Sequence, residues 1–174
     1  MLYSMKKRGF TVVELVITIT VMGILLALAV VNVTSTQINA RDTERKVDVE
    51  ATTNYLEIFY KNGSTASPTP GRYPSTQLLA SGETSIKSFL PDIEISNVTA
   101  PGASSVASSF IPATNSTQNE TGVSPQPTTE QYVYQPIQSK GALCTAESQE
   151  CRKFNIFYRL EGDNAVKKVM SKNQ

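Results

Sequence analysis

The sequence predicts an α+β protein in which a long amino-terminal helix packs on a small antiparallel sheet near the carboxyl terminus. Three observations predict this fold. Residues 10–33 form an apolar run, residues 34–62 continue it without proline or glycine, and strand-like alternation appears only after residue 131. A helical pattern followed by strand patterns, rather than an alternation of the two, is typical of α+β proteins.

The apolar run of residues 10–33 is long enough to cross a membrane. At about 1.5 Å of rise per residue it makes roughly 36 Å of helix, and a bilayer core needs about 20 apolar residues. Basic residues occupy positions 6–8, so the positive-inside rule places the amino terminus in the cytoplasm and the remainder outside. A cleaved secretory signal is the alternative, because residues 27–29 read Ala-Leu-Ala and fit a small-x-small cleavage pattern. The charge at Glu14 and the apolar residues beyond that cut argue against it.

Glu14 is the single charged residue between Arg8 and Arg41. A carboxylate near the centre of a bilayer costs about 2.5–3.5 kcal/mol on insertion scales, and such residues are functional candidates by default. A neighbouring cation would offset much of that cost if the geometry is good. Glu14 is therefore the first candidate functional residue.

Residues 34–62 are predicted to extend the same helix and to end it at Asn62-Gly63, a common stop signal. Apolar residues recur there at helical spacing, which predicts a face that packs on the domain core. This predicted core face consists of Val47, Ala51, Tyr55 and Ile58, widened by Leu56, Phe59 and Tyr60. The whole helix is expected to have about 50 residues and to be roughly 75 Å long by its rise.

Charged residues crowd the stretch from Arg41 to Glu50. Oppositely charged residues spaced as helix neighbours add about 0.2–0.5 kcal/mol per pair. Three pairs have this spacing: Arg41–Glu44, Asp42–Lys46 and Lys46–Glu50. One interpretation is a solvated helix face. The other is that some of these charges pair with neighbouring copies of the chain.

Residues 63–131 are rich in Ser, Thr, Pro and Gly and are predicted to form mainly loops. A short helix is expected to open at Ser81, as its N-cap, and to end at Pro91, with Glu83 in its first turn. Gly102 to Gln131 are expected to be long surface loops. They would serve either as a flexible spacer or as a glycan-bearing or partner-binding segment.

Residues 132–174 carry the strand patterns. Tyr132-Val133-Tyr134 is a short strand candidate, and Phe154 to Leu160 alternate apolar and polar residues as a half-buried strand does. Gly162-Asp163-Asn164 signals a turn, after which Ala165 to Met170 are expected to return as a partner strand. An antiparallel sheet of about three strands would cover the helix.

Cys144 and Cys151 lie just before the strongest strand pattern. In an oxidising space a disulfide between them is favoured, and it would contribute about 2–3 kcal/mol in the chain-entropy model. The alternative is a pair of reduced cysteines, one or both of them buried. Their spacing is not Cys-x-x-Cys, which argues against a redox enzyme.

The composition argues against catalysis more generally. The chain of 174 residues has 16 Lys and Arg against 15 Asp and Glu, and it has no His. Balanced charge gives no basic field for nucleic acid. Without His, a Ser-His-Asp or Cys-His site cannot be built and the commonest metal ligand is missing. Two cysteines are too few for a Cys-rich zinc site. We expect a protein that is not an enzyme and has no catalytic, cofactor or metal site.

The residues around the start of the apolar run resemble a known signal. Residues 9–15 read Gly-Phe-Thr-Val-Val-Glu-Leu and follow Lys6-Lys7-Arg8. This resembles the class III signal of type IV pilins and pseudopilins. Looser similarities to these families lie at Gly23, at residues 40–42 and 55–60, and in Gly71-Arg72-Tyr73-Pro74, which is similar to the Tyr-Pro loop of pseudopilins and Gram-positive-type pilins.

The resemblance implies how the chain is processed. Prepilin peptidase would cut after Gly9 and remove a leader of residues 1–9, and Phe10 would become an N-methylated first residue. The new amine on Phe10 then lies one turn from Glu14, and in a filament the amine of the next subunit can take that place. We hypothesise that this buried ion pair sets the axial register of the subunits during assembly.

The chain departs from many pilins at one point. Those proteins have a proline near the membrane exit of the helix, where this chain has Val31. Gly23, Thr18 and Thr20 are then the expected soft points. A helical glycine costs about 1 kcal/mol relative to alanine, and threonine hydroxyls can bond to carbonyls one turn earlier.

Together with the resemblance, the sequence predicts a structural subunit of a type IV pilus that serves adhesion, twitching motility or DNA uptake. The implied partners are other copies of the chain, prepilin peptidase, an inner-membrane assembly platform and the membrane, with no direct nucleic-acid signal. The chain would be a single-pass membrane protein before assembly and extracellular afterwards. A pseudopilin of a type II secretion-like system, or a membrane-anchored surface-binding protein that does not polymerise, are the alternatives.

Overall fold

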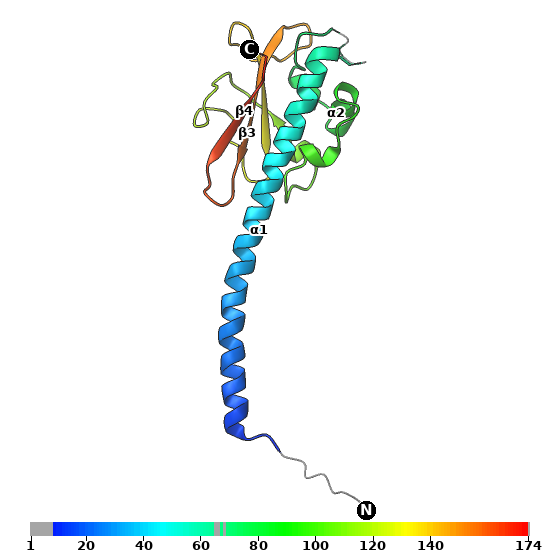
Figure 1. Ribbon diagram of the computed structural model, residues 1–174. Coiled ribbons are helices and arrows are strands. Elements are labelled where there is room, and N and C mark those ends of the chain that lie inside the picture. Colours follow the sequence, from blue (N-terminus) through cyan, green and yellow to red (C-terminus); the bar gives the residue numbers. More distant parts are fainter. Residues whose placement is uncertain (1–8, 65–66, 68, 174) are drawn as a thin grey trace, which may run out of the picture. The chain divides into compact units, whose positions relative to one another are not determined.

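The computed structural model describes residues 9–64, 67 and 69–173 (Figure 1). The chain divides into two units, residues 1–38 and 39–174. Helix α1, from Val12 to Asn62, contributes its first part to one unit and the remainder to the other. The predicted α+β class is confirmed, since a long amino-terminal helix is followed by a small sheet in the carboxyl-terminal region.

Residues close in sequence determine where α1 begins and where it ends. The helix begins at Val12 rather than at the predicted Phe10, because the Thr11 hydroxyl accepts the Glu14 N–H at 3.2 Å and caps the first turn. At the other end Gly63 has φ of 68° and donates its N–H to the Phe59 carbonyl at 2.7 Å. Glycine adopts this left-handed conformation without strain, which confirms the predicted stop.

A four-stranded sheet lies in the second unit, in the order β1-β2-β3-β4. Its strands are β1 (Phe110–Pro112), β2 (Tyr132–Gln138), β3 (Cys151–Arg159) and β4 (Val166–Met170). β2, β3 and β4 are antiparallel neighbours as predicted, but β1 pairs parallel to β2. The sheet is therefore mixed, and the prediction of a purely antiparallel sheet was wrong. β1 has three residues, too few to show an alternating pattern.

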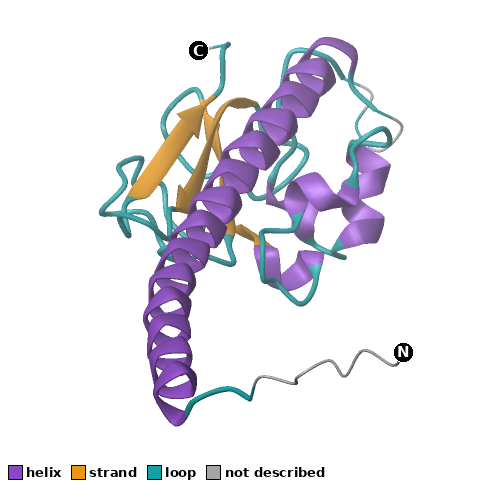
Figure 2. Ribbon diagram, turned by 60° about the horizontal axis from the view of Figure 1, so that its bottom comes forward, coloured by secondary structure: helices purple, strands orange, loops and turns teal. Residues whose placement is uncertain are grey.

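The main core lies between α1 and one face of the sheet. Figure 2 shows the second part of α1 crossing the sheet, and Leu56 of the helix is buried there with Phe154 and Ile156 of β3. Tyr73 is also fully buried, with its ring edge-on to Phe154 at a centroid distance of 4.8 Å. The Tyr-Pro loop is thus part of the core.

The face of α1 that packs on the core agrees with the prediction only in part, since Leu56 and Phe59 are buried in it and Tyr55 and Tyr60 pack against it. Val47 is 58% exposed and Ile58 is 52% exposed, whereas Val49 and Leu56 are buried. The true core face also buries Arg45, Asp48 and Thr52. These polar residues interrupt the apolar periodicity, so the predicted face included the exposed Val47 and Ile58 and omitted part of the buried side.

The opposite face of the sheet is covered by the segment between β1 and β2. A second buried cluster joins the two: Ala113, Val123, Val133 and Phe157. The Arg159 guanidinium also donates to the carbonyl of Pro127 at 2.8 Å. The predicted flexible spacer is therefore wrong for this stretch, because its few apolar residues suffice to pack it on the sheet.

Four short helices precede or adjoin β1: η1 (Thr76–Leu79), α2 (Glu83–Phe89), η2 (Ile95–Val98) and α3 (Val106–Ser109). Figures 1 and 2 show α2 beside α1, with β3 and β4 on the other side of α1. A short helix in the region of α2 was predicted, but its N-cap is Gly82 with φ of 57° and not Ser81. The Ser81 N–H instead donates to the Ser85 hydroxyl at 3.1 Å.

Cys144 and Cys151 are joined by a disulfide, and both are buried. The loop that it closes carries Glu147, whose carboxylate accepts the Ser75 N–H at 2.8 Å and the Ser75 hydroxyl at 2.5 Å. The Thr76 N–H donates to the Cys144 carbonyl at 3.0 Å. The bridge thereby ties the segment after the Tyr-Pro loop to the start of β3.

Candidate processing and assembly segment

The bond between Gly9 and Phe10, where the leader cut is predicted, lies in exposed, irregular backbone. Residues 9–11 precede α1 and belong to no helix or strand, and Phe10 is 82% exposed. A protease binds its substrate in an extended form, so a bond outside the helix needs no unwinding before it is cut. The basic residues 6–8, which belong to the same predicted signal, lie outside the described residues.

Glu14 has a partner that the sequence interpretation missed. Its Oε2 accepts the Thr11 N–H at 3.1 Å and the Thr11 hydroxyl at 3.0 Å, while the Glu14 N–H donates back to the Thr11 hydroxyl. This reciprocal arrangement is a capping box, whose signature is Ser or Thr followed three residues later by Glu or Gln. Thr11-Val12-Val13-Glu14 carries that signature and would have revealed it.

The capping box leaves half of the carboxylate available. All the described bonds to the Glu14 side chain end on Oε2, and no described residue donates to Oε1. A carboxylate offers about four lone-pair sites. Glu14 can therefore keep its bonds to Thr11 and still accept an ammonium group from outside its own chain.

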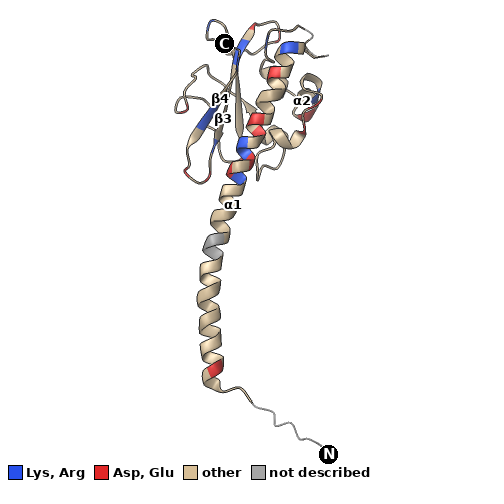
Figure 3. Cartoon of the chain, viewed as in Figure 1, with Lys and Arg blue, Asp and Glu red and all other residues tan. Residues whose placement is uncertain are grey.

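The remainder of α1 in the first unit is an exposed apolar surface. Glu14 is the one charged residue in the described chain before Arg41, and Figure 3 shows the first part of α1 mostly in tan, the colour of uncharged residues. Leu15, Met22 and Leu26 are each more than half exposed. By length and composition α1 contains a stretch apolar enough to cross a membrane. Such a surface is stable only when lipid or other protein covers it.

The predicted soft points lie within continuous helix. Thr18 donates its hydroxyl to the Leu15 carbonyl at 2.8 Å, and Thr20 donates to the carbonyls of Val16 and Ile17 at 2.8 and 2.9 Å. The expected back-bonding of both threonines is thus confirmed. These bonds satisfy the two hydroxyls inside the helix, which removes most of the cost of placing them in lipid.

In the second unit, the charges of α1 form pairs other than the predicted helix neighbours. Arg45 is 2% exposed, and it donates to Asp42 Oδ1 at 2.8 Å and to the Thr129 carbonyl at 2.7 Å. Asp42 also accepts the N–H groups of Glu161 and Gly162 at 2.8 and 2.9 Å. Burial opposes ionisation of Asp42, but these two N–H groups and Arg45 outweigh it and hold its pKa below the usual value.

Arg41 completes the same network. Its Nη2 and Nε donate to the two carboxylate oxygens of Glu161 at 2.6 and 2.8 Å. The interpretation of a solvated face is therefore wrong for Asp42 and Arg45, which are buried, and the half-buried Arg41 pairs with Glu161 of its own chain. These residues hold the turn between β3 and β4 against α1.

Two further carboxylates of α1 are buried, and the sequence interpretation missed both. Glu57 accepts the Tyr73 hydroxyl at 3.0 Å, the Lys172 N–H at 2.8 Å and the Asn173 amide at 2.7 Å. It therefore fixes the segment after β4 to the helix. No local pattern signals this role, because its partners are distant in sequence.

The second buried carboxylate, Asp48, has a different environment. Among the described residues, one donates a hydrogen bond to it: the Tyr132 hydroxyl, at 2.9 Å. Burial raises the pKa of Asp48 to about 6; the bond from Tyr132 opposes this rise, and the nearby Glu44 charge adds to it. Burial likewise raises the pKa of Tyr132.

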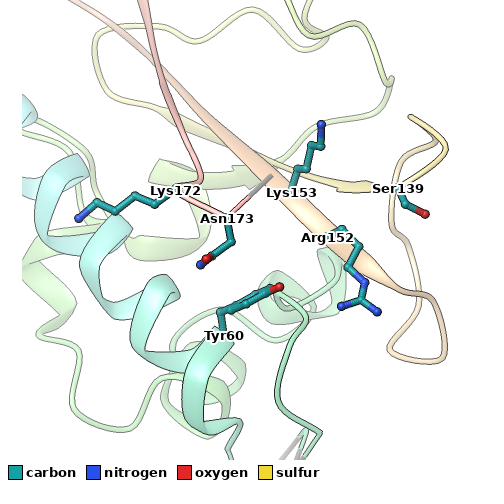
Figure 4. Close-up of a pocket in the computed structure, with 6 residues that line it drawn as sticks. All are labelled: Tyr60, Ser139, Arg152, Lys153, Lys172 and Asn173. Atoms are coloured by element: carbon teal, nitrogen blue, oxygen red, sulfur yellow. The ribbon is translucent and has the colours of Figure 1, made fainter.

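A hollow of about 700 Å³ lies at the end of α1 and is lined by Tyr60, Ser139, Arg152, Lys153, Lys172 and Asn173. Three of these side chains are cationic, which is a feature of anion-binding sites. Figure 4 shows, however, that the side chains of Arg152, Lys153 and Lys172 point in different directions. Arg152 already donates to the Gly71 carbonyl at 2.7 Å and to Glu150 at 3.2 Å. The cations do not converge on one ligand position.

Within the part of the chain that the structure describes, no group of three or more His, Cys, Asp or Glu side chains could hold a metal ion. The features that remain are the cleavable segment, the capped acid and the apolar surface of α1.

The segment around the predicted cleavage site matches a known family model. Residues 4–30 match the family model described as the prokaryotic N-terminal methylation motif. No curated protein and no solved structure matches the chain. The matched residues include Gly9, Phe10 and Glu14, which carried the resemblance found in the sequence.

This motif is typical of proteins that carry a class III signal followed by an apolar amino-terminal helix. More specifically, it supports a type IV pilin-like or pseudopilin protein. It indicates a structural protein rather than an enzyme and implies processing by prepilin peptidase. It also fits a chain that is anchored in a membrane and later extracellular.

Proposed function

We propose that this chain is a prepilin that becomes a structural subunit of a type IV pilus, with the filament used for adhesion, twitching motility or DNA uptake. Cleavage after Gly9 removes the leader, Phe10 is methylated, and an assembly platform in the inner membrane polymerises the subunits through α1. The single observation that carries the proposal is the placement of Glu14 four residues after Phe10, in an otherwise apolar helix that bears the methylation motif.

The geometry of Glu14 supports a role between subunits. Its cap with Thr11 holds the carboxylate at the very start of α1, and Oε1 is free to accept the Phe10 ammonium of the next subunit. Apolar helix surfaces attract one another without fixing how far one slides along the other. A charge pair formed in low dielectric supplies that register, because any other register leaves two buried charges unpaired.

The exposed side chains of the first unit support burial against other subunits. A helix that is apolar on every side is stable in lipid or in the centre of a helical bundle. A non-polymerising anchor would gain from the apolar surface, but it has no use for Glu14, because a carboxylate in lipid costs about 2.5–3.5 kcal/mol on insertion scales.

A pseudopilin of a type II secretion-like system is the second candidate. Tyr73 and Pro74 favour it through the similarity of their loop to that of pseudopilins. Both are buried, and the Pro74 carbonyl accepts the Tyr134 hydroxyl at 2.7 Å. The two candidates share processing and polymerisation and differ in whether the filament extends beyond the cell.

The proposal is tested by making the chain in cells with and without prepilin peptidase. We expect cleavage after Gly9 and sheared surface filaments only when the peptidase is present. The variant Gly9→Leu should stay uncut and inserted in the membrane, since a branched side chain replaces the small residue at the scissile bond. Filaments made from uncut Gly9→Leu would overturn the proposal. Processed subunits that form only short periplasmic polymers would favour the pseudopilin.

A further inference from the structure

Basic side chains gather around the hollow at the end of α1. Arg152, Lys153 and Lys172 line it. Lys140 is exposed in the turn beside Ser139, which also lines the hollow. These four cations are named here the basic cluster. The net charge of the whole chain is +1, so the balanced composition conceals a local concentration of positive charge, which attracts anions.

A β-bulge in β3 brings two of these cations to the same hollow. Ile137 of β2 pairs with Lys153. The next residue, Gln138, pairs with Cys151, which leaves Arg152 without a partner on β2. Neighbouring residues of a regular strand point to opposite faces of the sheet, whereas a bulge redirects the side chains around it. Arg152 and Lys153 therefore both line the hollow although they are adjacent in sequence.

Two acids contact residues that line the hollow, and both are already engaged. Glu57 is buried, and its carboxylate accepts hydrogen bonds from groups of its own chain. Glu150 pairs with Arg152 at 3.2 Å. Within the described part of the chain, the lysines of the basic cluster have no ion-pair partner: Lys140, Lys153 and Lys172. Their charges are available to a ligand.

The shape of the hollow argues against a single small anion as its ligand. The hollow has a volume of about 700 Å³, and Figure 4 shows the side chains of Arg152, Lys153 and Lys172 pointing in different directions. A small ligand is held by polar groups that converge on it. Cations that diverge can instead each meet a different charge of one long ligand. The arrangement therefore fits a polymer with repeated negative charges.

The chemistry of the available cations favours phosphodiesters over carboxylates. A carboxylate is planar and is best matched by the planar fork of arginine. Arg152, however, already donates to the Gly71 carbonyl and to Glu150. The remaining cations are lysines, which bind phosphate as point charges. A phosphodiester chain is also densely charged, and each cation that neutralises a phosphate releases a condensed counterion, which favours binding.

We propose that the basic cluster is a binding site for a linear phosphodiester polymer, which it recognises through the phosphates. Single-stranded nucleic acid and polyol phosphate chains share this chemistry. The inference goes beyond the proposed function and does not depend on polymerisation, since every residue of the basic cluster belongs to the second unit of a single chain.

The test compares the full-length chain in detergent with a triple variant that carries Lys140→Gln, Lys153→Gln and Lys172→Gln. Fluorescence anisotropy measures the affinity of each protein for labelled single-stranded DNA, poly(glycerol phosphate) and hyaluronate, a carboxylated polymer. The basic residues 6–8 are the same in both proteins, so the ratio of the two affinities reports the basic cluster. We expect the triple variant to bind the phosphodiester polymers about tenfold or more weakly, and hyaluronate with little change.

The salt dependence of binding identifies contacts with phosphates. Each cation that neutralises a phosphate of a single strand contributes about 0.7 to the slope of log affinity against log salt concentration. The slope for single-stranded DNA should therefore be smaller by about 2 in the triple variant. Weaker binding of both phosphodiester polymers assigns the site to the phosphodiester chain itself, and weaker binding of one alone identifies that polymer as the ligand. No change with either, or an equal loss with hyaluronate, would overturn the proposal.

A matched control separates the site from the net charge. Lys46→Gln, Lys167→Gln and Lys168→Gln together remove the same charge from residues outside the basic cluster, and this variant should bind as the wild type does. Lys153→Arg keeps the charge within the basic cluster and should also bind normally. Equal losses in the two triple variants would refute the assignment. Because binding is measured on chains that have not polymerised, its failure leaves the pilus proposal intact.

Discussion

Glu14 and Thr11 hold one another at the start of α1, with the Thr11 N–H and hydroxyl 3.1 and 3.0 Å from Glu14 Oε2. This relationship changes the interpretation of Glu14, which is more than an isolated charge in an apolar helix. In the single chain it closes the first turn, and in the proposed polymer its other oxygen receives the Phe10 amine of a neighbour. The two roles are chemically separable.

Replacing Thr11 tests the first role. Thr11→Ala removes the hydroxyl that accepts the Glu14 N–H, and a lost N-cap costs about 1 kcal/mol. We expect the amides of Glu14 and Leu15 to exchange about fivefold faster in detergent-solubilised protein. Thr11→Ser keeps the hydroxyl and should exchange at the wild-type rate. Unchanged exchange in Thr11→Ala would show that the capping box does not hold the helix start.

Replacing Glu14 separates the charge from the cap. Glu14→Gln retains a side-chain oxygen that can accept from Thr11, but it cannot pair with an ammonium group. We expect Glu14→Gln and Glu14→Val both to insert in the membrane and both to abolish filaments, measured as protein in the sheared fraction. Normal filaments from Glu14→Gln would assign the function of Glu14 to the cap alone.

Arg45 is expected to be the most sensitive charged residue of the second unit. Arg45→Ala leaves Asp42 and the Thr129 carbonyl buried without their partner, a change that costs about 3–5 kcal/mol. Lys46→Ala, one residue later on the exposed side, should change stability by less than about 0.5 kcal/mol. Urea unfolding of the detergent-solubilised chain, followed by tyrosine circular dichroism, would measure both. Equal midpoints for the two variants would contradict the network.

Asp48 gives stability a dependence on pH. Its folded-state pKa is about 6, against 3.8 for the unfolded group, so the folded protein holds this proton more tightly. Its contribution is greatest below pH 4 and is lost as pH rises through 6, by about 3 kcal/mol at about 1.4 kcal/mol per pKa unit.

The variant Asp48→Asn tests that dependence. The amide still accepts the Tyr132 hydroxyl but does not ionise. We expect Asp48→Asn to be more stable than the wild type at pH 7 and the difference to shrink toward pH 4. The quantity to measure is this difference in unfolding free energy between the two proteins, because Asp42 and Glu161, whose pKa values are lowered, affect both equally. A difference that is constant with pH would contradict the assignment.

Much of the fold could be predicted because its signals are local. The stop at Gly63 and the strands β3 and β4 follow from residue types that act within a few positions. The burial of Leu56 and Phe59 was predicted. The polar part of the same helix face was not, because Arg45, Asp48 and Thr52 are buried by partners far along the chain. The same holds for β1, which pairs in parallel with β2 through three residues and has no pattern of its own.

In the candidate site, too, the features with a local sequence signal could be predicted and the others could not. The placement of Glu14 after Phe10 identified the processing segment from sequence, since charge in an apolar run is conspicuous. The capping box also has a local signature, in the spacing of Thr11 and Glu14. The exposure of Val47 and Ile58 could not be predicted, because periodicity alone does not say whether an apolar residue packs on its own core.

The intact mass and amino-terminal sequence of filament protein sheared from cells test the central claim most directly. The account predicts a chain that begins at methylated Phe10. Its mass should be that of residues 10–174 plus one CH2, the net gain from N-methylation, and minus the two hydrogens of the Cys144–Cys151 bridge. A chain that begins at Val30, or one in filaments that retains Met1, would contradict it.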